Sequence, residues 1–199
     1  MAMSEASSTA CQIEASAAGA RSLSDRLQTL VSDHHAFLWR SLRRLGVADG
    51  DVDDAVQQVF LVAFRRLPEI AKKSERAFLF QTALRVAADW RRAHKRRCEQ
   101  AGLDLREVPD SSAGPEELMD RRRARALLDR VLGALPMDLR AVFVLFELEE
   151  LTMMEIATMS DIPPGTVASR LRRARQAFQE AVRTMTSGPG AARDERGGA

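Results

Sequence analysis

Apolar residues recur every three or four positions just before Pro68, and this repeat limits the possible folds more than any other feature of the sequence. Such spacing places one apolar stripe along an α-helix, whereas a half-buried strand alternates at every second position. Arg65 and Arg66 lie where the helix dipole favours positive charge, and Pro68 ends the segment. The stripe consists of Val56, Val59, Phe60, Ala63, Phe64 and Leu67. The segment therefore predicts a helix that buries this stripe against other helices.

Similar spacing in the rest of the chain predicts an all-α protein. Hydrophobic residues make up 45% of the sequence, which is enough for real cores, but aromatic residues make up only 5% and tyrosine is absent. Glycine and proline are scarce inside the periodic segments, so a β-sandwich or barrel is disfavoured. Further helices are predicted from about residue 22 to Gly46, from 76 to 97, from 120 to 135, from 138 to 149, and in a pair after Leu151.

A polar, acidic stretch divides the helices into two small domains. It contains two glycines and two prolines, has almost no periodicity, and is too long for a connection inside one compact domain. Both ends of the chain are small and polar, which is typical of disorder. The predicted organisation is a disordered tail over 1–21, a domain over 22–97, a flexible acidic linker over 98–119, a domain over 120–186, and a disordered tail over 187–199.

The chain contains two basic blocks although its net charge is only +2. One lies between Arg91 and Arg97, the other lies between Arg170 and Arg175, and the acidic linker separates them. Two basic surfaces suggest two contacts with a polyanion, although solvated helix faces would give the same pattern.

Residues 151–175 carry the most informative pattern in the chain. Thr152 and Glu155 have the spacing of a capping box, which predicts the start of a short helix. Ser160–Pro163 reads as a tight turn, and Pro164 suits the first position of a second helix with an arginine-rich outer face. The pattern predicts a helix-turn-helix, in which one helix enters the major groove and arginines hold guanine edges and phosphates. The alternative is an ordinary helical hairpin with solvated arginines.

These residues also resemble the promoter-reading region 4 of the extracytoplasmic-function group of bacterial sigma factors. The matching segments are Glu155-Ile156-Ala157, Gly165-Thr166-Val167, Ser169-Arg170-Leu171 and Arg173-Ala174-Arg175. Residues 54–60 (DAVQQVF) resemble the DLVQEVF segment of the same family, and residues 76–80 with 88–92 resemble its RAWLF and LDWLRR segments in regions 2.3 and 2.4. The two signatures occur in the family's order and together cover residues 22–185.

The resemblance implies a sigma factor, not an enzyme. Such a factor binds core RNA polymerase, recognises −35 and −10 promoter elements and promotes DNA opening, here in a stress or envelope response. The implied partners are the clamp and flap regions of core RNA polymerase, promoter DNA and an anti-sigma factor. The acidic linker is expected to lie in the RNA path of the polymerase.

The resemblance also assigns three sets of binding residues. Those expected to read the −35 element are Thr166, Ser169, Arg170, Arg172, Arg173 and Arg175. Those expected at the −10 element are Arg85, Asp89, Trp90, Arg91, Arg92, Lys95 and Arg96, with residues 69–75 as the base-selecting loop. Those expected to contact polymerase are Asp54, Gln57, Gln58, Leu61 and Arg65. Trp90 serves equally well as a core residue, because its ring is large and apolar.

Five positions depart from the family pattern. Ala168 replaces a frequent lysine and removes one expected DNA contact, and Ser160 replaces a leucine. Asp161 stands where glycine is common, but aspartate tolerates the left-handed conformation that the turn needs. Phe78 replaces a tryptophan. Arg85 replaces an asparagine, and because of this change the base preference of the family does not transfer directly.

Two other classes of function compete with the sigma-factor interpretation. A dimeric helix-turn-helix repressor or activator would bind a palindrome without polymerase, and the match to region 2 argues against it. A nucleic-acid enzyme would need a site, yet the three histidines lack a carboxylate cluster at metal-ligand spacing and no glycine-rich phosphate loop occurs. The sequence therefore predicts no cofactor and no metal.

The sequence favours a cytoplasmic protein. Cys11 and Cys98 have no partner spacing for zinc or a redox pair, as expected in a reducing compartment. Residues 1–20 lack the basic start and apolar run of a signal peptide. No segment approaches the roughly 20 apolar residues that span a bilayer.

Overall fold

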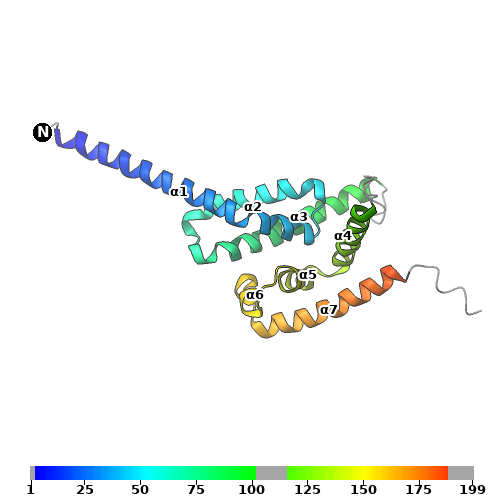
Figure 1. Cartoon of the computed structure of the whole chain (residues 1–199). Coiled ribbons are helices and arrows are strands. Elements are labelled where there is room, and N and C mark those ends of the chain that lie inside the picture. Colours follow the sequence, from blue (N-terminus) through cyan, green and yellow to red (C-terminus); the bar gives the residue numbers. More distant parts are fainter. Residues whose placement is uncertain (1–2, 102–115, 188–199) are drawn as a thin grey trace, which may run out of the picture.

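The computed structural model describes residues 3–101 and 116–187, and these residues form helices and turns without a strand (Figure 1). The all-α fold is therefore confirmed. The elements are α1 (Met3–Arg44), η1 (Asp49–Asp51), α2 (Val52–Arg66), η2 (Leu67–Glu69), η3 (Lys72–Ser74), α3 (Glu75–Ala101), α4 (Glu116–Ala134), α5 (Met137–Phe143), the π-helical turn η4 (Val144–Leu148), α6 (Met153–Ser160) and α7 (Pro164–Thr186). We call α1 to α3 the first unit and α4 to α7 the second unit.

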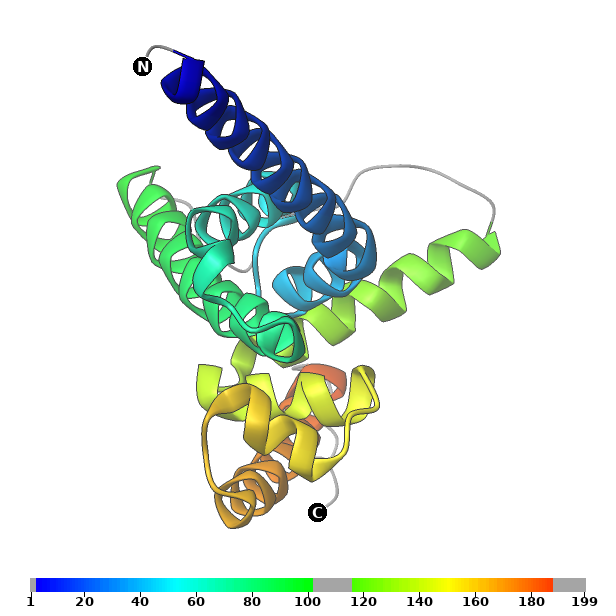
Figure 2. The ribbon, with the colours of Figure 1, turned by 90° about the vertical axis from the view of Figure 1, so that its left-hand side faces the viewer.

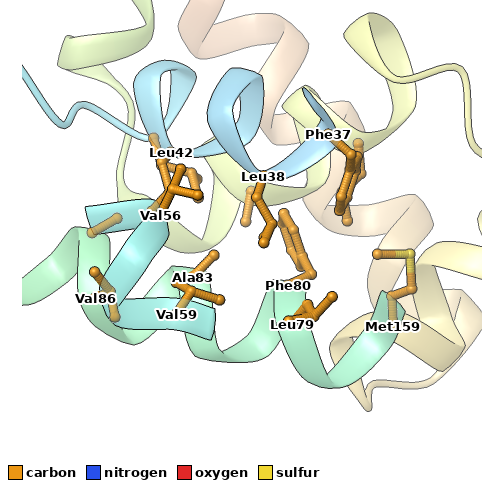
Figure 3. Packing of buried hydrophobic residues seen from close by; sticks show 14 of the residues in the cluster. Phe37, Leu38, Leu42, Val56, Val59, Leu79, Phe80, Ala83, Val86 and Met159 are labelled. Atoms are coloured by element: carbon orange, nitrogen blue, oxygen red, sulfur yellow. The ribbon is translucent and has the colours of Figure 1, made fainter. Parts of the chain in front are cut away.

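The first unit is a bundle in which α1, α2 and α3 each contact the other two. Leu38 and Leu42 of α1 pack between Val56 of α2 and Phe80 of α3, and all four are at most 3% exposed (Figure 3). The predicted stripe of α2 is buried, with one exception. Phe64 is 52% exposed. At about 100° per residue it lies about 80° around the helix from the centre of the stripe, toward solvent.

The helices extend further than the sequence predicted. α1 begins at Met3 and its N-terminal half projects beyond the bundle, where a disordered tail was expected over residues 1–21 (Figures 1 and 2). Residues 3–18 contain no glycine or proline and include five alanines, which favours helix over coil. The predicted linker is also helical at both ends, because α3 continues to Ala101 and α4 begins at Glu116. The rest of the linker and the tail from residue 188 lie outside the described residues.

Gly46 reverses the chain after α1 in a left-handed conformation, with φ of +96°. Its amide donates to the carbonyl of Arg43, and the amide of Val47 donates to that of Leu42, which caps the helix. An added Cβ would lie 2.7 Å from Nη1 of Arg140 and 3.2 Å from Cδ of Arg91. Glycine is therefore required here both by its backbone angle and by the space around it.

Replacing Gly46 with alanine is expected to lower the free energy of unfolding by about 1–3 kcal/mol, because the change strains the backbone and displaces a hydrogen-bonded guanidinium. Urea denaturation followed by circular dichroism measures the effect. Gly133 provides the matched control, since nothing lies within 4 Å of its Cβ position inside α4. Gly133→Ala is expected to stabilise the protein by about 0.5–1 kcal/mol. A Gly46→Ala variant as stable as the parent would show that a side chain at this position causes no strain.

In the second unit, α6 and α7 form the predicted helix-turn-helix. The capping box is confirmed: Oγ1 of Thr152 accepts from the amide of Glu155, and the Glu155 carboxylate accepts from the amide of Thr152 at 2.8 Å. The hydroxyl and amide of Thr152 also lower the pKa of Glu155. Asp161 ends α6 with φ of 53°, so it adopts the left-handed conformation expected in the turn. Behind the motif, the rings of Phe143 and Phe178 stack at 4.7 Å.

The two units pack on one another, and one cluster of buried side chains runs through both. Met159 of α6 lies beside Leu79 and Phe37 of the first unit (Figure 3). Arg140 of α5 is 1% exposed and donates to the carbonyls of Leu45 and Leu135. Burial, with the nearby charge of Arg91, lowers the pKa of Arg140 to about 9. The buried charge opposes the packing at neutral pH, and its two carbonyl partners offset part of that cost.

Charged pairs surround this contact. The carboxylate of Glu149 accepts from Arg40 at 2.8 Å and from Arg44 at 2.6 Å, so an acid of the second unit holds two arginines of α1. The hydrogen bond to Glu149 raises the pKa of Arg40, whereas burial lowers that of Arg44. Arg43 similarly contacts Asp129 of α4 at 2.9 Å.

Glu149→Gln is expected to destabilise the contact between the units by about 2 kcal/mol, because it leaves two facing arginines without their carboxylate. Differential scanning calorimetry of the full chain should then resolve two unfolding transitions in place of one. Glu150→Gln makes the same chemical change at the next, exposed residue and should leave the transition as it is. Identical scans for both variants would show that Glu149 does not couple the units.

Candidate nucleic-acid and polymerase interfaces

The outer face of α7 presents a row of basic residues because its inner face is fixed in the core. Val167, Leu171 and Ala174 are at most 2% exposed. The helix periodicity then turns Arg172 and Arg173 outward, and both are exposed. The basic row of the predicted −35 set therefore lies on the free side of the second helix of the motif.

The remaining members of the predicted −35 set lie closer to the body of the second unit. Thr166 and Ser169 are half-buried, and the Ser169 hydroxyl donates to the carbonyl of Thr166 at 3.0 Å. Nε of Arg170 lies 3.7 Å from the carboxylate of Asp138. Arg175 donates to Glu147 at 2.7 Å and stacks 5.3 Å from the ring centre of Phe146. Arg172 and Arg173 are thus the two arginines of this set most available to a ligand.

A second basic face lies on α3. The exposed residues follow one another at steps of three and four, which places them on one side of the helix. They are Arg85, Asp89, Arg92 and Arg96, with Lys95 beside them. Asp89 forms an ion pair with Arg92, and Lys95 lies 3.7 Å from Glu99.

Trp90 and Arg91, also expected at the −10 element, are half-buried. Trp90 packs against the core of the first unit, and its indole Nε1 donates to Oε1 of Gln58 at 3.2 Å. Arg91 lies against Gly46, and burial lowers its pKa. The structure therefore brings Trp90 to the α2–α3 contact and leaves part of its surface free.

The outer ridge of α2 holds all the residues expected to contact polymerase. Asp54, Gln57, Gln58, Leu61 and Arg65 are exposed. Leu61 is 49% exposed and Phe64, one turn further, is 52% exposed. Two large apolar side chains on one exposed helix surface favour a partner that covers them. Sequence reasoning missed Phe64 because it counted the residue in the buried stripe.

The loop between α2 and α3 borders a hollow. The hollow has a volume of about 310 Å³ and is lined by Arg66, Glu69, Ile70, Ala71, Ser74 and Phe78. The guanidinium of Arg66 lies 5.8 Å from the ring centre of Phe78 and pairs with Glu69 at 3.1 Å. Residues 71–74 are exposed, and two of them, Ala71 and Ser74, line the hollow.

In the part of the chain that the structure describes, no three His, Cys, Asp or Glu side chains gather in a way that would hold a metal ion. His35 stacks on Phe60 at 6.5 Å, and burial lowers the pKa of the neighbouring His34. None of the described helices is both long and apolar enough to cross a lipid bilayer.

Known families and proteins match both units. A family profile described as "Sigma-70 region 2" matches residues 30–97, and one described as "Sigma-70, region 4" matches residues 125–178. The chain is 35% identical over 150 residues to the ECF RNA polymerase sigma-E factor of Escherichia coli (strain K12), covering 70% of this chain and 78% of that protein. It is 30% identical over 152 residues to the ECF RNA polymerase sigma factor SigE of Mycolicibacterium smegmatis, covering 76% and 59%.

Solved structures share the fold. CnrH, solved in complex with the cytosolic domain of CnrY, aligns with a TM-score of 0.61 and 25% identity over 81% of this chain and 92% of its own. The sigma factor RpoE of Bartonella quintana, solved with the anti-sigma factor NepR, aligns with a TM-score of 0.55 over 82% of this chain and 98% of its own. The second match, at 18% identity, supports the fold alone.

Proposed function

Since this chain belongs to the extracytoplasmic-function (ECF) family of RNA polymerase sigma factors, which direct the polymerase to promoters, we propose that its two units read the two promoter elements separately. The observation that carries the proposal is the pair of exposed basic helix faces, on α3 in region 2 and on α7 in region 4. Each unit offers one such face to a polyanion.

We assign the −35 element to α7. The major groove admits one helix, and an exposed arginine at its surface can donate two parallel hydrogen bonds to a guanine edge. Arg172 and Arg173 occupy that position, while Thr166 and Ser169 lie nearer the first turn of the helix. Arg175 and Arg170, which are close to acids of their own unit, are placed to hold phosphates at the margin.

The −10 element is assigned to α3 and the adjoining loop. Opened DNA is bound by a basic groove combined with aromatic or pocket contacts. The face formed by Arg85, Arg92, Lys95 and Arg96 supplies the charge, and the half-buried Trp90 supplies an aromatic edge. The hollow beside residues 69–75 has room for a nucleobase.

The α2 ridge is the proposed contact with the polymerase clamp, because it combines polar side chains with the exposed Leu61 and Phe64. The second unit is expected to bind the flap. An anti-sigma factor is the remaining proposed partner, since both structural relatives above were solved as complexes and NepR is described as an anti-sigma factor. The chain then acts as a polymerase subunit rather than as an enzyme.

Size-exclusion co-elution with bacterial core RNA polymerase tests this function first. The full chain is expected to co-elute with the core enzyme in stoichiometric amounts, and the complex should start transcripts at discrete sites on genomic DNA fragments that core enzyme alone does not use. Failure to co-elute with an active core enzyme, together with binding to a palindromic DNA site, would replace the proposal with a polymerase-independent regulator.

A further inference from the structure

One arginine of α1 joins both ends of the loop between α2 and α3. Arg26 donates from Nη1 to the carbonyl of Leu67 at 3.0 Å and from Nη2 to the carbonyl of Ile70. Its Nε and Nη2 also donate to Oε1 of Glu75, at 2.8 and 2.6 Å. A single guanidinium therefore connects residues that are 41 to 49 positions away in the sequence.

The loop has little structure of its own to hold this shape. Only two single-turn 3-10 helices, Leu67–Glu69 and Lys72–Ser74, lie between α2 and α3. Leu67 and Ile70 are buried, so their side chains fix the first half of the loop. Residues 71–74 are exposed. The second half is therefore held mainly where Glu75, 8% exposed, meets Arg26.

The arrangement of acceptors around Arg26 suits an arginine and no other residue. Three acceptors lie around one planar group: two backbone carbonyls and a carboxylate. Guanidinium presents five N–H donors in a fixed fork, whereas a lysine ammonium is a single point charge and cannot reach all three at once. The side chain of Arg26 is 27% exposed and lies at the margin of the bundle, not in its core.

We propose that Arg26 is a positioning residue, which fixes the loop of residues 67–75 around its hollow and thereby sets promoter base selection. This rests on the proposed function, in which that loop meets the −10 element. Arg26 contacts no DNA itself. It holds the backbone at Leu67 and Ile70 so that the exposed residues 71–74, of which Ala71 and Ser74 line the hollow, keep one arrangement.

The test uses the full chain in two measurements. Amide hydrogen exchange of the free protein reports how firmly the loop is held. Holoenzyme reconstituted with core polymerase then transcribes a pool of promoter fragments randomised across the −10 element, and sequencing of the used templates gives the preference for each base. Arg26→Ala is expected to raise exchange within residues 67–75 by about tenfold and to lower the strongest base preference by about tenfold. Arg26→Lys, which keeps the charge without the fork, should fall between that variant and the parent.

Arg40→Ala is the matched control, because it removes an arginine of the same helix that pairs with Glu149 and lies about 21 Å further along α1 than Arg26. It should change neither loop exchange nor base preference. Variants of Arg26 that stay within twofold of the parent in both measurements overturn the proposal. Faster exchange spread equally through α2 and α3 also overturns it, since Arg26 would then support the whole bundle. If the parent chain forms no transcribing holoenzyme, the proposed function and base selection by the loop fail together, while the exchange measurement still decides whether Arg26 holds the loop.

Discussion

Replacing Arg172 and Arg173 together with alanine is expected to reduce transcription from a promoter that depends on its −35 element by about 100-fold or more. Both side chains lie on the exposed face of α7. A well-placed arginine contributes about 1–3 kcal/mol of discrimination at a base edge, so the loss of two such arginines accounts for a reduction of about 100-fold or more. The core of the second unit should remain intact, because Val167, Leu171 and Ala174 are unchanged and buried.

Quantitative run-off transcription measures the effect, and co-elution with core polymerase should be unchanged. Arg183→Ala is the matched control. It removes an exposed arginine near the end of the same helix, where Arg183 pairs with Glu180. It should retain activity within about twofold. The double variant should also show a smaller dependence of promoter binding on salt, since fewer cations are displaced from phosphates. Normal transcription by the double variant would mean that α7 is not the reading helix.

The helix-turn-helix could be predicted closely from the sequence because its determinants are local. The capping box depends on two residues three positions apart, and the left-handed turn depends on Asp161 alone. Periodicity then decides which side chains of α7 face inward. The basic faces of α3 and α7 follow from the same local rules, so the exposure of Arg92 and Arg172 could be predicted without tertiary information.

Other features depend on neighbours that no local pattern specifies. Phe64 has the right spacing for the apolar stripe, but the helices that cover the stripe leave it exposed. The hydrogen bonds of Arg26 to the loop join residues more than 40 positions apart. The salt bridges of Glu149 with Arg40 and Arg44 cross more than 100 positions. Nothing in the charge pattern distinguishes these arginines from solvated ones, because pairing depends on how the units pack.

Trp90 is placed to serve both as a core residue and as a DNA contact, the two alternatives that the sequence left open. Its ring packs against the core of the first unit, and its indole N–H donates to Gln58 on the α2 ridge. A half-buried ring still presents an edge beside the basic face of α3. The same hydrogen bond makes Gln58 an unsuitable position for testing polymerase contact, since a change there would also move Trp90.

Leu61 is a better position than Gln58 for testing the polymerase contact. Leu61→Glu is expected to weaken binding of the full chain to core polymerase by about 100-fold or more. Its side chain is 49% exposed on α2, beside the equally exposed Phe64. A carboxylate forced into an apolar contact loses its hydration without gaining a partner, and central apolar residues of an interface commonly contribute about 2–4 kcal/mol. Because Leu61 lies outside the core, thermal unfolding of the free variant should match that of the parent.

Fluorescence anisotropy of labelled protein titrated with core polymerase gives the dissociation constants. Leu23→Glu introduces the same charge at a leucine that is 39% exposed on α1, away from the ridge, and should bind like the parent. Leu61→Ala should show an intermediate loss, because it removes apolar contact without adding charge. Transcription by Leu61→Glu should fall at every promoter alike and recover at high polymerase concentration, which separates a docking defect from the promoter-specific defect of the α7 variant. Unchanged affinity would show that the polymerase binds another surface and that the exposed apolar pair on α2 serves a different partner.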